Sequence, residues 1–285
     1  SSRFVVVSRE IIWQSPILLT PYRADYTIDA DELGIFIDSA YKSAKLERDD
    51  IDSGAVILTG EALKRTNARA IADLFAAESG KFVCASAGHN LEALMAAHGS
   101  GAVELSRKEH KTFLNIDVGG GTTKFALVQG GRLLDSSAVA VGGRLIAFDD
   151  DGKLVRIEGP AERMAEEAGL KLKLGNKLSK VDRQKFVDTM IGVLIETIGR
   201  GKLSKLTRDL MLTPTLPSKI KIDAITFSGG VSEFIFKREK SDHGDVGGDL
   251  AARFRELLVE RAPHLRQHEE TALGGHQPQH VGGGL

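Results

Sequence analysis

An aspartate, three successive glycines and two threonines stand together between two apolar runs of this chain, at Asp117, Gly119, Gly120, Gly121, Thr122 and Thr123. Glycines let a backbone turn tightly and come close to a ligand. A tip of this kind presents several N–H groups and two hydroxyls to one point, an arrangement that holds phosphate groups. An aspartate at the preceding strand end can hold a hydrated Mg²⁺ or a water near those phosphates. The segment therefore predicts a phosphate-binding hairpin.

Two strands are needed to position this tip. Apolar residues alternate through Leu114–Val118, which predicts the strand leading in, and the apolar run Phe125–Val128 predicts the returning strand. A glycine-rich tip is often only a turn, and Thr123 could serve that turn as well as a phosphate. Lys124 would point away from a phosphate if Thr123 points toward it, so we expect Lys124 at the solvated surface. The flanking aspartate and threonines favour the phosphate site.

Two more glycine-rich strand ends come later in the chain, at Ser228-Gly229-Gly230 and at Gly142-Gly143. The first follows an apolar run that predicts a strand over 223–227. Without Cβ atoms at its end, a flat base or a ribose can lie on the backbone. Taken alone, this motif could be a mere turn. Two common nucleotide motifs, G-x-x-x-x-G-K-[ST] and a strand-to-helix G-x-G-x-x-G, are absent.

Composition limits the classes of function. The chain has 285 residues, a formal net charge of −1 and 6% aromatic residues, which disfavours a nucleic-acid surface and base-stacking platforms. The single cysteine, Cys84, lies in an apolar run and is expected to be a core thiol, with no disulfide and no cysteine-based zinc site. No apolar run is long enough to span a bilayer. We expect a soluble, cytoplasmic protein with no nucleic-acid and no membrane partner.

Strands and helices alternate in the first half of the sequence, which predicts an α/β layer structure. Strands are expected over 4–7, 55–59 and 81–87, and helices over 31–44, 62–79 and 91–98. Asn90 is a plausible N-cap of the last of these helices. Glu61 is an acidic residue at a strand end and is a candidate for the same site. Later helices are expected over 184–198 and 250–258.

The order of these segments resembles the actin, Hsp70 and sugar-kinase ATPase superfamily, whose two related lobes clamp ATP between two phosphate hairpins. Asp117–Thr123 resembles the second phosphate motif, and Ser228–Val231 resembles the adenosine motif that follows it. Gly142-Gly143 resembles the glycine pair that approaches the nucleotide from the second lobe. Glu92 stands where the Hsp70 pattern has a glutamate that assists water or metal. It could equally be a first-turn acid that favours the helix dipole.

This resemblance implies a two-lobed α/β fold of the actin-like ATPase (ribonuclease H-like) type. Residues 1–112 would form the first lobe, 113–262 the second lobe and 263–285 an irregular tail. The superfamily's first phosphate motif, an Asp-x-Gly-x-Thr-Thr hairpin, would belong just before Ser1, so we expect a chain that is incomplete at its N-terminus. The tail histidines have no helical period, which favours a poorly defined segment over a metal site: His264, His268, His276 and His280.

At finer resolution the chain resembles the family of ethanolamine ammonia-lyase reactivating factors. Besides the phosphate hairpin, the matching segments are Ser8–Pro16, Leu58–Arg69, Ala85–Glu92, Gly99–Ala102 and Val141–Leu145. The resemblance is weak in the tail. That family uses ATP and Mg²⁺ to release damaged cobalamin from inactivated ethanolamine ammonia-lyase, an adenosylcobalamin-dependent enzyme. The resemblance implies a cytoplasmic factor that acts on ethanolamine ammonia-lyase and is associated with the ethanolamine-utilisation microcompartment. The lyase, and not this factor, would bind the cobalamin.

The resemblance also implies roles for the candidate residues. Gly119–Thr123 would hold phosphates through backbone N–H and hydroxyl groups, and Asp117 would hold Mg²⁺-bound water. Glu92 would orient the attacking water or a metal-bound water, while Gly229 and Gly230 would face adenosine. Two other classes share this scaffold, namely nucleotide-binding assembly scaffolds and small-molecule kinases or hydrolases, and fold alone does not choose among them. Neither the oligomeric state nor the hydrolysis rate follows from the sequence.

Overall fold

The computed structural model describes residues 10–16, 18, 20, 21, 23, 27–58, 82–86, 88–261 and 266–268. The chain divides into two compact units, one made of Ser1–Gly88 with Leu273–Leu285 and the other of His89–Ala272. The expected strand at 4–7, the expected helix at 62–79 and the candidate Glu61 lie outside the described residues.

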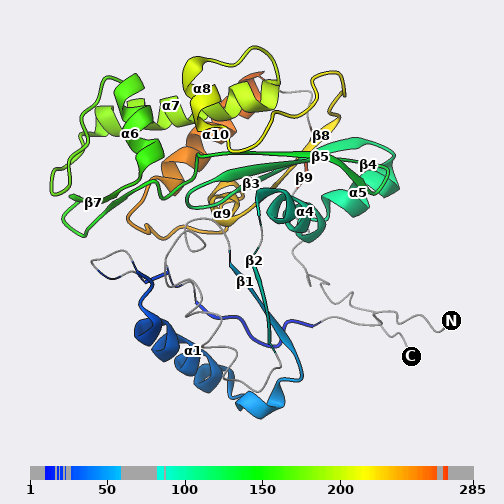
Figure 1. Ribbon diagram of the computed structural model, residues 1–285, viewed down its shortest axis with the longest axis vertical. Helices are drawn as coiled ribbons and strands as arrows, with labels where there is room; N and C mark the ends of the chain where they lie inside the picture. Colours follow the sequence, from blue (N-terminus) through cyan, green and yellow to red (C-terminus); the bar gives the residue numbers. More distant parts are fainter. Residues whose placement is uncertain are drawn as a thin grey trace, which may run out of the picture. The chain divides into compact units, whose positions relative to one another are not determined.

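The first unit combines a helix with a parallel strand pair. Its described elements are α1 (Ala30–Ala44), the short helix η1 (Arg48–Asp50), β1 (Gly54–Leu58) and β2 (Phe82–Ser86) (Figure 1). β1 and β2 run parallel and in register from Gly54 opposite Phe82. Parallel neighbours need a crossover connection between them, as α/β units have. The expected helix at 31–44 and strands at 55–59 and 81–87 are confirmed, with small shifts at their ends.

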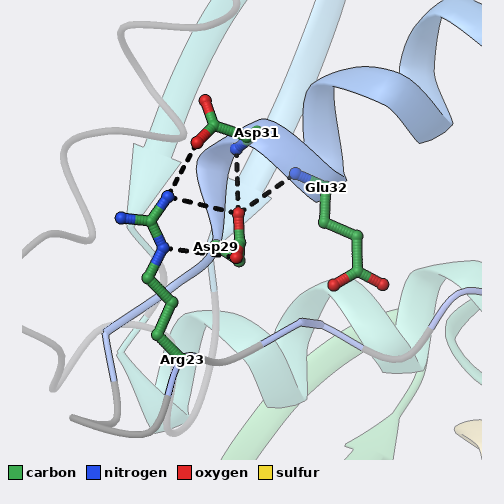
Figure 2. A network of polar contacts seen from close by, with 4 residues as sticks. All are labelled: Arg23, Asp29, Asp31 and Glu32. Atoms are coloured by element: carbon green, nitrogen blue, oxygen red, sulfur yellow. Dashed lines mark hydrogen bonds and ion pairs between the residues drawn. The ribbon is translucent and has the colours of Figure 1, made fainter.

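A carboxylate fixes the start of α1. The side chain of Asp29 accepts hydrogen bonds from the backbone N–H groups of Asp31 and Glu32, which have no partner inside the helix (Figure 2). Arg23 donates to this Asp29 carboxylate at 3.2 Å and to the Asp31 carboxylate at 2.8 Å. The guanidinium and the two backbone bonds hold the pKa of Asp29 below its usual value. One acid therefore caps the helix and anchors the preceding segment.

A five-stranded mixed sheet forms the centre of the second unit. Its strands are β3 (Thr112–Val118), β4 (Thr123–Gln129), β5 (Arg132–Val139), β8 (Ala224–Ser228) and β9 (Arg266–His268). They lie in the order β5-β4-β3-β8-β9, and only β4 runs against its neighbours. The order combines a three-stranded meander with two parallel strands. This placement brings the ends of β3 and β8 to the same edge of the sheet.

Helices and a small hairpin surround this sheet. The helices are α4 (His89–Gly99), α5 (Ala102–Glu109), α6 (Gly159–Glu167), α7 (Lys180–Gly199), α8 (Lys205–Leu210), α9 (Gly230–Ile235) and α10 (Gly247–Arg261). The hairpin consists of β6 (Ile146–Phe148) and β7 (Leu154–Ile157). Figure 1 shows α4 and α5 on one side of the sheet and α7 and α10 on the other.

The side-chain alternation of the strands divides the core between the two faces. Leu114, Ile116 and Val118 of β3 join a large apolar cluster with α7, α9 and α10. Phe113 on the opposite face joins a smaller cluster with α4 and α5. The residues that follow Phe113 on that face are Asn115 and Asp117, so the smaller core becomes polar toward the end of β3. This change of polarity positions the candidate site.

Two sequence predictions are wrong in detail. Asn90 is not an N-cap, because α4 already begins at His89; its side-chain oxygen instead accepts a hydrogen bond from Ser136 at 3.2 Å. The tail is not irregular throughout, because Arg266–His268 forms the edge strand β9 beside β8. An edge strand needs only one hydrogen-bonded side, so a polar stretch with no apolar alternation can occupy it.

The helices α5 and α9 have no counterpart among the expected elements, since both are short and begin directly after glycines. In the described part of the chain, no helix is both long and apolar enough to cross a membrane.

Phe227 offers a test of the large core. Its side chain is fully buried and meets the ring of Phe254 edge to face at 5.5 Å. Phe227→Ala is expected to lower the free energy of unfolding by about 3–5 kcal/mol, through lost burial and the cavity left behind. Val181→Ala on the exposed side of α7 should change it by no more than about 0.5 kcal/mol. Urea unfolding followed by far-ultraviolet circular dichroism measures both, and equal losses would contradict this account of the core.

Candidate functional site

The connection between β3 and β4 forms a tight glycine hairpin with free backbone donors. The Gly119 N–H closes the turn on the Thr122 carbonyl at 3.0 Å. Among the residues that the structure describes, none accepts a hydrogen bond from the backbone N–H of Gly120, Gly121 or Thr122. Gly120 is exposed, and Gly121 and Thr122 are half-buried. Three adjacent N–H donors at a turn form the kind of concavity that binds anions.

The segment after β5 fastens this hairpin from the side. The N–H of Gly143 donates to the Gly119 carbonyl at 3.0 Å, and the N–H of Arg144 donates to the Gly120 carbonyl at 2.6 Å. The Thr123 hydroxyl donates to the Val141 carbonyl at 2.7 Å, and its side chain is fully buried. Thr123 therefore holds the hairpin to the segment that follows β5. The carbonyl groups of Gly119 and Gly120 accept hydrogen bonds from that segment, whereas the N–H groups of the tip remain open.

Gly142 and Gly143 are required by close packing. A Cβ atom added at Gly142 would lie 2.5 Å from the carbonyl carbon and oxygen of Gly120, and one at Gly143 would lie 2.8 Å from Val231 Cγ2. Real Cβ atoms do not approach neighbours this closely, so any side chain at Gly142 must displace the hairpin tip. The glycine pair thus sets the distance between this segment and the tip.

A chain of hydrogen bonds, buried at Asn115 and part-buried at Asp117, connects β3 with β8. Ser228 donates to the Asp117 carboxylate at 3.1 Å and accepts from the Asn115 amide at 3.0 Å. Thr226 donates to the Asn115 amide oxygen at 2.8 Å. These residues face one another in the parallel register, Asn115 opposite Thr226 and Asp117 opposite Ser228. The motif at the end of β8 is therefore part of the same site as Asp117.

Gly229 brings the backbone of this second motif against Asp117. Its φ of +83° lies in the left-handed region, which favours glycine. A Cβ there would lie 2.5 Å from the Val118 carbonyl oxygen and 2.9 Å from Asp117 Oδ1. Gly230 follows as the exposed first residue of α9. The sequence-predicted residues Asp117, Gly119–Thr123, Gly142-Gly143 and Ser228–Gly230 thus meet at one edge of the sheet.

Glu92 and Lys124 form a buried ion pair at this edge. Glu92 projects from the first turn of α4 and Lys124 from β4, directly opposite Asp117 in the antiparallel register. The side chains are only 5% and 6% exposed. The prediction that Lys124 lies at the solvated surface is wrong, because α4 covers this end of the sheet. One carboxylate oxygen of Glu92, Oε1, is buried without a hydrogen-bond partner.

The electrostatics of Asp117 follow from this arrangement. Burial raises the pKa of Asp117 above its ordinary value, while the ammonium of Lys124 and the hydrogen bond from Ser228 act to lower that pKa. The carboxylate of Glu92 raises it further. Two acids share one cation, so the group carries a net negative charge when all three are ionised. Such a group favours a ligand that brings positive charge or hydrogen-bond donors.

Mg²⁺ fits this group only in company with other ligands. The described residues contain no cluster of three or more His, Cys, Asp or Glu side chains that could hold a metal by themselves. Mg²⁺ commonly binds through one or two carboxylates, with waters and phosphate oxygens completing its shell. Asp117 and the unpaired oxygen of Glu92 fit that role beside three open N–H donors.

Sequence reasoning missed Lys124, Asn115 and Thr226 as parts of the site. Asn115 precedes Asp117 by one strand repeat and so shares its face, which is a signal in the sequence itself. Nothing in the sequence indicates that a helix covers Lys124.

The sheet order and the meeting of two glycine-rich strand ends define the class. A meander followed by parallel strands, with the phosphate-type hairpin inside it, is a lobe of the actin-like ATPase (ribonuclease H-like) type, and the α/β class is confirmed. Within that class the chain belongs to the family of the ethanolamine utilisation protein EutA, whose family model matches residues 2–275.

Two curated relatives carry the same name, ethanolamine ammonia-lyase reactivase EutA. The protein of Escherichia coli K12 is 36% identical over 288 residues, and the match covers 96% of this chain and 60% of that protein. The protein of Salmonella typhimurium LT2 is 35% identical over 283 residues, with the same coverage. The chain thus spans 60% of the length of the curated relatives it matches. A Ppx/GppA phosphatase of Aquifex aeolicus is similar in structure, with a TM-score of 0.37 and 12% identity over 72% of this chain and 52% of that one.

The raised pKa of Asp117 predicts a gain in stability when its charge is removed. Because its pKa is raised in the folded protein, the folded state binds a proton more tightly than the unfolded chain. The free energy of unfolding then falls as the pH rises from the ordinary pKa of an aspartate through the raised pKa of Asp117. Asp117→Asn should therefore be more stable than the unsubstituted protein near neutral pH, and the difference should shrink in acid. Thermal unfolding in buffer with a chelator, across this pH range, measures it; a variant less stable at neutral pH would contradict the prediction.

The packing of Gly142 predicts a specific loss. Gly142→Ala must shift the hairpin tip and should cost about 1–3 kcal/mol of unfolding free energy, as overpacking does. The matched control is Gly192→Ala on the exposed side of α7, where an added Cβ meets nothing within 4 Å. That change should stabilise the protein by roughly 0.5–1 kcal/mol, because alanine favours a helix interior over glycine. Urea unfolding compares the two variants.

Proposed function

We propose that this chain supplies the nucleotide-binding part of an ATP-dependent factor that releases damaged cobalamin from inactivated ethanolamine ammonia-lyase. Membership of the EutA family and the names of the two curated relatives support the choice of partner. The observation that carries the nucleotide role is the row of three free N–H donors at the hairpin tip, next to the half-buried carboxylate of Asp117.

In this proposal each part of the site has one task. The N–H groups of Gly120, Gly121 and Thr122 bind phosphate oxygens, and the fastened carbonyl side of the tip keeps those donors in place. Asp117 holds water on Mg²⁺, and Glu92 orients a water through the oxygen that has no partner. The ion itself would supply positive charge to the phosphates. The glycines at the end of β8, Gly229 and Gly230, border the adenosine.

Release of a cofactor from a partner requires that ATP be coupled to partner affinity. ATP must bind one conformation of the factor more tightly than another, and the affinity for the lyase must differ between the two. The chain itself needs no cobalamin site in this scheme, because the lyase holds the damaged cofactor. The factor would act in the cytoplasm, in association with the ethanolamine-utilisation microcompartment.

Reactivation of the lyase tests the proposal. Ethanolamine ammonia-lyase is inactivated with a tightly bound cobalamin analogue, and the factor, in the longest form that its gene encodes, is added with ATP, Mg²⁺ and fresh adenosylcobalamin. Acetaldehyde formation should recover only when ATP is present. Asp117→Asn should abolish the recovery while the variant stays folded, because its side chain no longer carries the charge that holds the hydrated ion.

The matched control makes the same chemical change away from the site. Asp150→Asn lies in the exposed turn between β6 and β7 and should leave the recovery unchanged. Recovery without ATP, or full recovery with Asp117→Asn, would overturn the proposal. ATP binding without any effect on the lyase would favour an assembly scaffold in its place.

A further inference from the structure

Lys124 is a cation enclosed in the candidate phosphate site with no task among those assigned above. Lys124 belongs to β4 and follows Thr123, whose hydroxyl donates a hydrogen bond to the Val141 carbonyl. It lies opposite Asp117 on the face of the sheet that α4 covers. Its ammonium group pairs with Oε2 of Glu92, and its side chain is 6% exposed. An ammonium group so enclosed is costly unless charges of opposite sign compensate it.

The charges of this group are unequal. Lys124 lies opposite Asp117 in the register and is paired with Glu92, and both the lysine and the glutamate act on the charge of Asp117. Lys124 therefore offsets one of two negative charges. Without it, the buried Glu92 carboxylate and the half-buried Asp117 carboxylate would repel each other and attract any cation small enough to enter. With it, one negative charge remains, together with an unpaired oxygen on Glu92.

We infer that Lys124 is the internal counter-ion of this site. It holds the Glu92 carboxylate beside Asp117 and keeps the two acids from binding a divalent cation before nucleotide arrives. The cation then enters only with phosphate groups, whose oxygens supply the ligands and the charge that the protein withholds. This inference rests on the proposed nucleotide role and makes Lys124 a positioning residue, since its ammonium group is engaged with Glu92 and not with the hairpin tip.

Substitution of Lys124 by an uncharged side chain of similar length should expose the hidden cation site. The test uses the full chain, without nucleotide, with Mn²⁺ as the probe, measured by paramagnetic resonance of free Mn²⁺ and by thermal unfolding. Lys124→Met should bind Mn²⁺ about tenfold or more tightly than the unsubstituted protein, as removal of one nearby unit charge implies. Mn²⁺ should also raise its melting temperature by more than that of the unsubstituted protein.

Two further variants separate charge from shape. Lys124→Arg keeps the positive charge and should gain no affinity for Mn²⁺. Combining Lys124→Met with Glu92→Gln removes one acid along with the cation and should return Mn²⁺ binding to the level of the unsubstituted protein. If Lys124→Met is unfolded in metal-free buffer, Mn²⁺ should restore its fold, and the double variant should fold without metal. A folded Lys124→Met with no gain, or an unfolded one that Mn²⁺ does not restore, would make Lys124 a structural brace only.

The outcome is separable from that of the proposed function, because the assay contains no ATP. ATP binding by the unsubstituted protein is measured alongside by calorimetry with Mg²⁺. A gain in Mn²⁺ affinity with no ATP binding would overturn the nucleotide role and leave the counter-ion role standing. ATP binding by the unsubstituted protein, with no gain in Mn²⁺ affinity for Lys124→Met, would overturn the counter-ion role and leave the nucleotide role standing.

Discussion

A half-buried carboxylate at the end of the central strand, that of Asp117, is the constraint on which the site depends. An ionised carboxylate that leaves water costs on the order of several kcal/mol unless hydrogen bonds and opposite charge compensate it. Asp117 accepts a hydrogen bond from Ser228 on β8, and Lys124 on β4 supplies the opposite charge. A slip of one residue by either neighbouring strand would turn its partner to the opposite face. Compensation of this one charge therefore ties together the registers of three strands.

The backbone part of the site could be predicted from the sequence because its signal is local. Three glycines after an aspartate, and a second glycine pair after a strand, each identify a place where backbone must turn or pass close to other atoms. The structure gives the reason at Gly142 and Gly229, where a Cβ atom would overlap a neighbouring carbonyl. Among the described residues, the alternating strands and the longer helices also carry local patterns, so their existence was predictable and only their ends shifted.

The side-chain part could not be predicted in the same way, because it depends on which helix covers which face. Strand alternation puts Lys124 opposite Asp117, but only α4, packed over that end of the sheet, makes the lysine a buried cation. Asn90 shows the same limit, since its pattern suits a cap and its observed partner, Ser136, belongs to a strand distant in sequence. For β9, pairing with β8 compensates for the missing apolar alternation.

The ion pair also connects the site with the first helix of the second compact unit. Unit 1 ends its first segment at Gly88, and α4 starts at the next residue, with Glu92 in its first turn. Ala93 and Ala97 hold α4 to the smaller apolar cluster, whereas Glu92 holds its first turn to β4 through a charge. Apolar contacts do not respond to an incoming ion, but a charged contact does. A ligand that competes with Lys124 for Glu92 therefore acts first on the first turn of α4, the start of the second compact unit.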